Sequence, residues 1–147
     1  MLNVAQSSGD YLQYEATLVN ATRTQGNLVW YNSEGEVQAK YPAVSGSGKP
    51  KYYTIPAGKW TATFVNNEDA AKFTRHGISF RVWLGPDRYD PLRGRETGLI
   101  RIHPARSLGT EGCIGLIGTE ANILDFETRI NSYINEYDSI IVNVIYH

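Results

Sequence analysis

The sequence is poor in cysteine, and its single cysteine, Cys113, excludes two structural uses of sulfur. One thiol cannot close an internal disulfide, and it cannot supply both thiolates of a two-cysteine metal site. The value of Cys113 therefore lies in packing or in reactivity. A chain of 147 residues needs no disulfide to form a core, because a domain of this size buries roughly two thirds of its unfolded surface.

An excess of charge of either sign is also absent. The chain has 14 basic and 15 acidic residues of mixed distribution, which argues against the positive surface of a nucleic-acid-binding protein. No apolar run approaches the roughly 20 residues of a membrane span, and the first ten residues lack the basic and apolar regions of an export signal. We expect no nucleic-acid partner and no membrane span, and we expect the chain to leave the cytoplasm only by another route.

The sequence does contain many short segments that favour strands, separated by glycine, proline and small polar turn residues. A helix is predicted over about 120–137, where apolar residues recur at spacings of three and four and Thr119 suits the N-cap. Together these elements predict one mainly β domain, a β-sandwich with one packed α-helix in the C-terminal half. The segments expected as strands are 11–18, 27–31, 37–44, 52–55, 59–65, 78–84, 99–103, 112–116 and 139–146.

Two of these segments carry His103 and Cys113, ten residues apart. Side chains alternate between the two faces of a strand, so the isoleucines before His103 share one face and His103 takes the other, together with Arg101. By the same alternation, Ile114 and Leu116 share one face and Cys113 takes the opposite face. Both polar side chains therefore point away from the apolar faces of their own strands.

A thiol beside an imidazole is the arrangement expected of a cysteine nucleophile with its base. The imidazole of His103 would take the proton of Cys113, and Gly112 would allow nearby backbone N–H groups to turn towards a developing oxyanion. The hydroxyl groups of Ser107 and Thr110 would orient the site. No metal or cofactor is needed, and either water or an amine could resolve the thioester, so hydrolysis and acyl transfer both remain open.

The segment around Cys113 resembles the catalytic motif of the L,D-transpeptidase, or YkuD-type, family: His, a variable gap, Ser or Thr, any residue, Gly, Cys, then Ile or Val and Arg. Residues 27–46 are similar to the opening hairpin of that family, and residues 53–62 to its Thr-Pro-x-Gly segment. The matching motif residues are His103, Thr110, Gly112, Cys113 and Ile114.

The resemblance implies a YkuD-like β-sandwich and a single catalytic domain over 1–147, in which 1–26 is either an N-terminal extension or the first strand. It also implies action on peptidoglycan stem peptides, with Cys113 as nucleophile and His103 as base. The family's cysteine is acylated by the L-centre carbonyl of a meso-diaminopimelate residue as D-alanine leaves. The implied reactions are transpeptidation, L,D-carboxypeptidase cleavage and D-amino acid exchange.

The chain departs from the family pattern in two places. Gly115 stands where the family usually has arginine, and the gap between His103 and Cys113 is short. The pattern is closer to the L,D-transpeptidase-like effectors of type VI secretion, which implies a toxin delivered to the periplasm or cell wall and a partner immunity or inhibitor protein. If the substrate carboxylate needs a cation, Arg101 or Arg106 would supply it.

Two further expectations complete this interpretation. Tyr89, in an irregular polar loop, is expected to border the substrate groove. The alternative function is a non-catalytic cell-wall-binding or phage structural module that keeps the fold without turnover.

Overall fold

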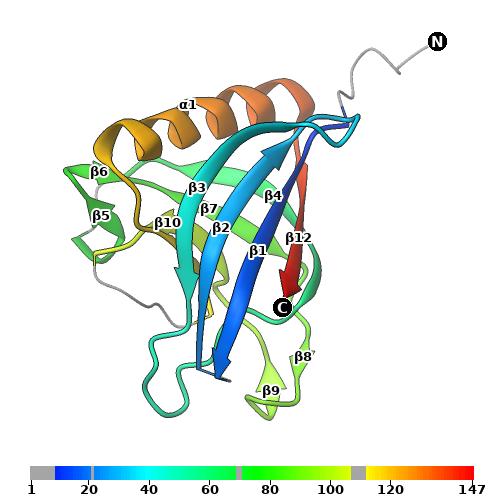
Figure 1. Ribbon diagram of the computed structural model, residues 1–147, viewed down its shortest axis with the longest axis vertical. Helices are drawn as coiled ribbons and strands as arrows, with labels where there is room; N and C mark the ends of the chain where they lie inside the picture. The colour runs from blue at the N-terminus through cyan, green and yellow to red at the C-terminus, as the bar shows by residue number, and fades with distance from the viewer. Residues whose placement is uncertain (1–8, 21, 69–70, 107–111) are drawn as a thin grey trace.

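The computed structural model describes residues 9–20, 22–68, 71–106 and 112–147. Within these residues, eight strands form one continuous sheet that closes into a barrel (Figure 1). The eight strands are β1 (Tyr11–Asn20), β2 (Arg23–Tyr31), β3 (Val37–Ser45), β4 (Gly58–Asn66), β7 (Arg81–Gly85), β10 (Arg101–Pro104), β11 (Ile114–Leu116) and β12 (Ile140–Tyr146). Their order around the barrel is β1, β12, β4, β7, β10, β11, β3 and β2, and β2 pairs again with β1.

Two parallel pairings stand out in a barrel whose other pairings are antiparallel. β1 pairs with β12 in parallel, so the first and last strands of the described chain lie side by side and complete the barrel. β10 pairs with β11 in parallel as well. Parallel neighbours cannot be joined by a tight hairpin, so the chain must cross back between Pro104 and Ile114 before it enters β11.

The helix α1 (Glu120–Tyr137) lies across one end of the barrel (Figure 1). It begins at Thr119, whose side-chain oxygen accepts a hydrogen bond from the backbone N–H of Asn122 at 3.2 Å. This bond satisfies one of the N–H groups that a helix start leaves without a partner. The apolar face of α1 covers the core with four buried residues, Ile123, Phe126, Ile130 and Tyr133.

Four short strands and a 3-10 turn extend from the barrel as two ribbons. The first ribbon follows the turn η2 (Ala71–Phe73) and pairs β5 (Thr74–Arg75) with β6 (Ile78–Ser79). The second pairs β8 (Tyr89–Asp90) with β9 (Arg95–Glu96). Figure 1 shows the β5–β6 ribbon beside the start of α1 and the β8–β9 ribbon at the opposite end of the molecule.

The structure confirms the predicted class, a mainly β fold with one helix, and it confirms the helix bounds. It differs at residues 78–84, where the sequence predicts one strand and the structure has β6 and β7 with a break at Phe80. Phe80 is fully buried, and its ring stacks on that of Phe126 at 5.8 Å. The strand pairing is interrupted at this residue, whose side chain packs in the core against α1.

Candidate active site

His103 lies in β10, and Cys113 lies in the bend directly before the neighbouring strand β11. The parallel register pairs His103 with Gly115. Cys113 lies two residues before Gly115, and residues two apart in an extended chain point to the same side. With strands about 4.8 Å apart and a rise of about 3.3 Å per residue, an ideal pair would place these two α-carbons about 8 Å apart. An imidazole and a thiol can meet across that separation.

The face that carries both side chains is the outer face of the barrel wall. Ile102 in β10 and Ile114 in β11 belong to the hydrophobic core. The next residue in each strand, His103 or Gly115, therefore points outwards. Even so, His103 is only 3% exposed and Cys113 only 4%. The two polar groups are therefore sheltered from water on the outside of the barrel.

The His103 ring is held in one orientation by two contacts. Its Nδ1 lies 2.7 Å from the carbonyl oxygen of Pro104, and its ring meets the edge of the Phe73 ring with centroids 4.8 Å apart. A carbonyl oxygen can only accept a hydrogen bond, so Nδ1 carries the proton. The lone pair of the neutral ring is then on Nε2, the nitrogen that can act as a base.

Burial keeps the His103 ring neutral. The pKa of the ring is lowered from 6.5 to about 4, mainly by loss of water around the ring and also by the positive charges of Arg101 and Arg81. The hydrogen bond to Pro104 opposes this shift but is the smaller effect. At neutral pH the ring therefore carries no positive charge.

The thiol of Cys113 has a backbone partner. Its Sγ donates a hydrogen bond to the carbonyl oxygen of Leu99 at 3.4 Å. Leu99 has a φ of 58°, in the left-handed region that side chains other than glycine seldom adopt. A strained backbone at Leu99 thus presents an acceptor to the thiol from the residues just before β10.

The turn before Cys113 requires glycine for two reasons. Gly112 has a φ of 69°, and a Cβ added to it would lie 2.5 Å from Nη2 of Arg93 and 2.9 Å from Cδ1 of Ile100. The N–H of Gly112 donates to the carbonyl oxygen of Tyr53 at 2.9 Å, so this group is already used and does not itself serve an oxyanion. Gly112 therefore shapes the backbone that leads to Cys113.

Arg93 is a residue of the site that sequence reasoning missed. Its guanidinium forms a buried ion pair with Asp90 and also donates through Nη2 to Tyr53 O at 3.3 Å. The carbonyl of Tyr53 thus binds both Arg93 and Gly112. The only signal in the sequence is the position of Arg93 in the polar loop that also carries Tyr89.

The other predicted site residues fall in different places. Arg101 lies two residues before His103 and is half-buried, with Cζ 5.0 Å from the centroid of the Trp83 ring. Arg106 is exposed after the end of β10, and Tyr89 is 62% exposed on the β8–β9 ribbon. Ser107 and Thr110 lie outside the described residues.

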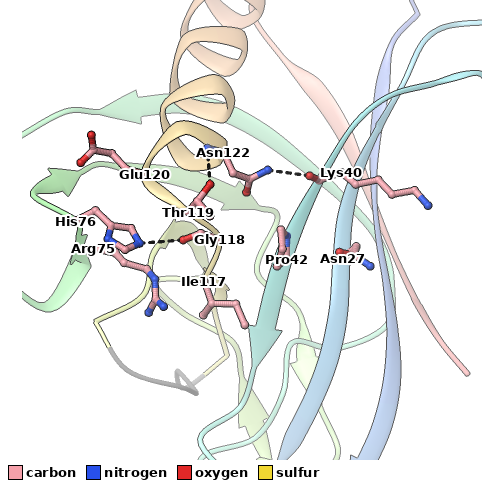
Figure 2. Close-up of a pocket in the computed structure, with 10 residues that line it drawn as sticks. All are labelled: Asn27, Lys40, Pro42, Arg75, His76, Ile117, Gly118, Thr119, Glu120 and Asn122. Atoms are coloured by element: carbon pink, nitrogen blue, oxygen red, sulfur yellow. Dashed lines mark hydrogen bonds between the residues drawn. The ribbon is translucent and has the colours of Figure 1, made fainter.

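An open groove of about 750 Å³ lies beside the start of α1 (Figure 2). One of its walls is closed by His76, whose Nε2 lies 3.1 Å from the carbonyl oxygen of Gly118. Arg75 links the groove to the site, because it lines the groove and donates from Nη1 to Ala105 O at 3.2 Å. The groove residues are Asn27, Lys40, Pro42, Arg75, His76, Ile117, Gly118, Thr119, Glu120 and Asn122.

Two searches of the described residues gave no candidates. No group of three or more His, Cys, Asp or Glu side chains in this part of the chain is placed to hold a metal ion. No helix there is both long and apolar enough to cross a membrane.

The fold is a barrel with a helix across one end, with an imidazole on β10 and a thiol directly before the parallel neighbour β11, and it defines a candidate cysteine-dependent acyl-transfer domain. Residues 16–131 match the family model YkuD, the L,D-transpeptidase catalytic domain, and the chain belongs to this family. The matched range contains Phe73, Arg93, His103 and Cys113. Membership supports an L,D-transpeptidase-type activity on peptidoglycan. Searches of the curated proteins and of the solved structures found no significant match.

Proposed function

We propose that the protein is a cysteine-dependent enzyme that cleaves or transfers peptidoglycan stem peptides through a thioester on Cys113. The observation that supports this proposal is the parallel pairing of β10, which carries His103, with β11, which begins directly after Cys113. The Nδ1–H tautomer of His103 supports it, because that tautomer leaves Nε2 as the base.

The mechanism begins with transfer of the thiol proton to Nε2 of His103. The thiolate then attacks the substrate carbonyl, and a tetrahedral oxyanion forms. As the carbon–nitrogen bond breaks, the imidazolium returns its proton to the departing amine and a thioester remains on Cys113. Water releases the shortened peptide, a D-amino acid gives the exchanged peptide, and the amine of a second stem gives a cross-link.

Purified muropeptides followed by mass spectrometry test this function. We expect released D-alanine, an exchanged D-amino acid or a cross-linked dimer, together with an acyl adduct on the intact protein. The Cys113→Ser variant should form neither thioester nor product, and His103→Gln should lower the rate of thioester formation by about 10²–10⁴-fold. Unchanged muropeptides with the folded wild-type protein would contradict the proposal.

We also propose that the protein acts on the wall from the periplasmic side, as an effector delivered by another machine. Two observations motivate this proposal. The short gap between His103 and Cys113 resembles that of the type VI effectors, and the proposed substrate lies outside the cytoplasm. Expression with an added export signal should stop growth, while expression in the cytoplasm should not. Growth arrest that persists with Cys113→Ser would argue against an enzymatic toxin.

A second candidate function, a cell-wall-binding module without turnover, is favoured by the burial of Cys113, which is only 4% exposed. A carbapenem separates the two candidates. An accessible activated thiol should open the β-lactam ring and add its full mass to Cys113 of the folded protein. No adduct on the folded protein, with retained binding to purified wall, would favour the binding module.

A further inference from the structure

Two arginine side chains and His103 share one phenyl ring on the outer face of the barrel. The guanidinium carbon Cζ of Arg101 lies 4.8 Å from the centroid of the Phe73 ring, and that of Arg81 lies 5.1 Å from it. The His103 ring meets the same phenyl ring at 4.8 Å. Phe73 is thus a common support for two cations and the proposed base.

A third arginine comes from the β5–β6 ribbon. Arg75 follows Phe73 by two residues and donates to the carbonyl oxygen of Ala105, two residues after His103. Arg75, Arg81 and Arg101 are called the arginine cluster below. Its members come from β5, β7 and β10, so it is assembled by the fold and not by one run of sequence.

The strand order fixes which side of His103 the cluster occupies. β10 lies between β7 and β11, and the register pairs Arg101 with Trp83 and Ile102 with Val82. Continuing this register by one residue places Arg81 opposite His103. Cys113 on the β11 side and Arg81 on the β7 side therefore flank His103 from opposite directions.

The positive charge of the cluster is not neutralised by a described acidic residue. The ion pairs found in the described part of the chain join Arg93 to Asp90 and Arg129 to Asp125, away from the cluster. The Nε atoms of all three cluster arginines are buried and have no hydrogen-bond partner among the described residues. Half-buried guanidinium groups close together repel one another and have lost part of their hydration, so an anion that binds them is strongly favoured. Arginine is also the side chain best suited to bind a carboxylate through two parallel hydrogen bonds.

We propose that the arginine cluster binds the free C-terminal carboxylate of the residue that Cys113 displaces from the stem peptide. This inference rests on the proposed function. His103 must return a proton to the departing amine, and the carboxylate carbon of that amino acid is two bonds from the amine nitrogen. The carboxylate therefore has to lie beside His103 on the side away from the thiol, which is where Arg81 and Arg101 are placed.

The cluster then determines which bonds the enzyme cleaves. A terminal residue with a free carboxylate is accepted, and so is a free D-amino acid that enters as the acceptor in exchange. A residue whose carboxyl group is blocked as an amide, as in a chain that continues past the cleaved bond, is disfavoured because the guanidinium groups are left without their anion. The protein is therefore selective for chain ends.

Two matched peptides test this inference: a tetrapeptide stem ending in D-alanine and the same stem ending in D-alaninamide. For the wild-type protein we expect kcat/KM to be at least about tenfold higher for the free acid. Arg81→Gln and Arg101→Gln should reduce the ratio of kcat/KM for the acid to kcat/KM for the amide towards one. The lysine variants at the same positions should recover part of the preference, and Arg129→Gln, on the exposed side of α1, should have no effect.

The outcomes separate this inference from the proposed function. Acyl-enzyme formed equally fast from the acid and the amide would overturn the carboxylate site and leave the thiol chemistry standing. If neither peptide acylates Cys113, the proposed function fails. Calorimetry with the Cys113→Ala variant then measures whether the acid binds more tightly than the amide, and so tests the carboxylate site by itself. Tighter binding of the acid, lost in Arg81→Gln and Arg101→Gln proteins that still unfold cooperatively, supports the site, and equal binding of both peptides overturns it.

Discussion

Among single residues, His103 links the chemistry of the site to the stability of the protein. Its pKa is about 4 in the folded chain because burial disfavours the charged ring, whereas an unfolded chain has a histidine pKa near 6.5. Between these values the unfolded state binds more protons than the folded state. Stability is therefore complete above pH 6.5 and declines as the pH falls towards 4.

We expect the free energy of unfolding to fall by about 3 kcal/mol between pH 6.5 and pH 4, at 1.36 kcal/mol for each pKa unit. Urea denaturation at a series of pH values measures this loss. The His103→Gln variant has no group to titrate at this position, so its stability should change less over the same range. Parallel curves for the two proteins would contradict the low pKa of His103.

Gly112 is the residue at which backbone and packing restrict substitution together. Gly112→Ala would place a side chain at a φ of 69° and force it against the Arg93 guanidinium. The strain alone costs about 1–3 kcal/mol, and displacement of Arg93 should slow thioester formation as well. Gly35→Ala is the matched control, because Gly35 has a φ of 80° but an added Cβ would meet only Tyr11 Oη, at 3.6 Å. Thermal unfolding and acylation rates should show loss of stability in both variants and loss of activity only in Gly112→Ala.

Strand alternation predicts that His103 and Cys113 point away from the apolar faces of their segments. It could not reveal Arg93, whose contacts with Tyr53 join residues 40 positions apart. It could not reveal Arg81 either, because Arg81 approaches His103 only through the pairing of β7 with β10. Contacts of this kind depend on which strands become neighbours, and a local pattern of residues does not contain that information.

On the scale of elements, the start of α1 gives a direct test of local structure. Thr119→Ala removes the oxygen that accepts from Asn122 N–H, and such a loss costs about 1 kcal/mol. In a chain of this length we expect the melting temperature to fall by about 2–4 °C. Thr128→Ala makes the same change on an exposed turn of α1 and should not lower the melting temperature, since alanine favours a helix more than threonine does. Equal losses in both variants would argue against the cap.

The predicted elements agree with the structure where the sequence pattern is long and regular. The spacing of Ile123, Phe126 and Ile130 predicted α1 with its observed bounds. The continuous strand predicted over 78–84 was wrong at Phe80, which lies between β6 and β7 and whose ring stacks on that of Phe126. An aromatic residue fits either face of a strand pattern, so its periodicity alone does not indicate a break.

For the molecule as a whole, the closed sheet makes β12 indispensable. β12 lies between β1 and β4, and its residues Val142 and Val144 belong to the core. A variant that ends at Asp138 should lose its cooperative thermal transition, because two strands lose their neighbour and the core opens. A variant that ends at Tyr146 lacks only the hydrogen bonds of His147 with Ala16 and Leu18 and should keep the transition. Circular dichroism against temperature compares the two, and a cooperative transition in the shorter chain would show that the barrel does not need closure.

The sequence indicated a sheet-rich fold with one helix but did not distinguish two separate layers from one closed sheet. Inward and outward residues alternate in both arrangements. The parallel pairing of β1 with β12, the first and last strands of the described residues, helps to close the sheet into a barrel. Nothing in the composition of either strand indicates its partner.

The shared ring of Phe73 has a consequence for how this protein can change by mutation. Since Arg81, Arg101 and His103 all contact that one ring, substitutions at these positions should show epistasis. The loss of stability in the double variant of Arg81 and Arg101 should differ from the sum of the losses in the two single variants by about 0.5–3 kcal/mol. The four positions would then evolve as a linked group, in which the residue at 73 decides which changes at the other three are tolerated.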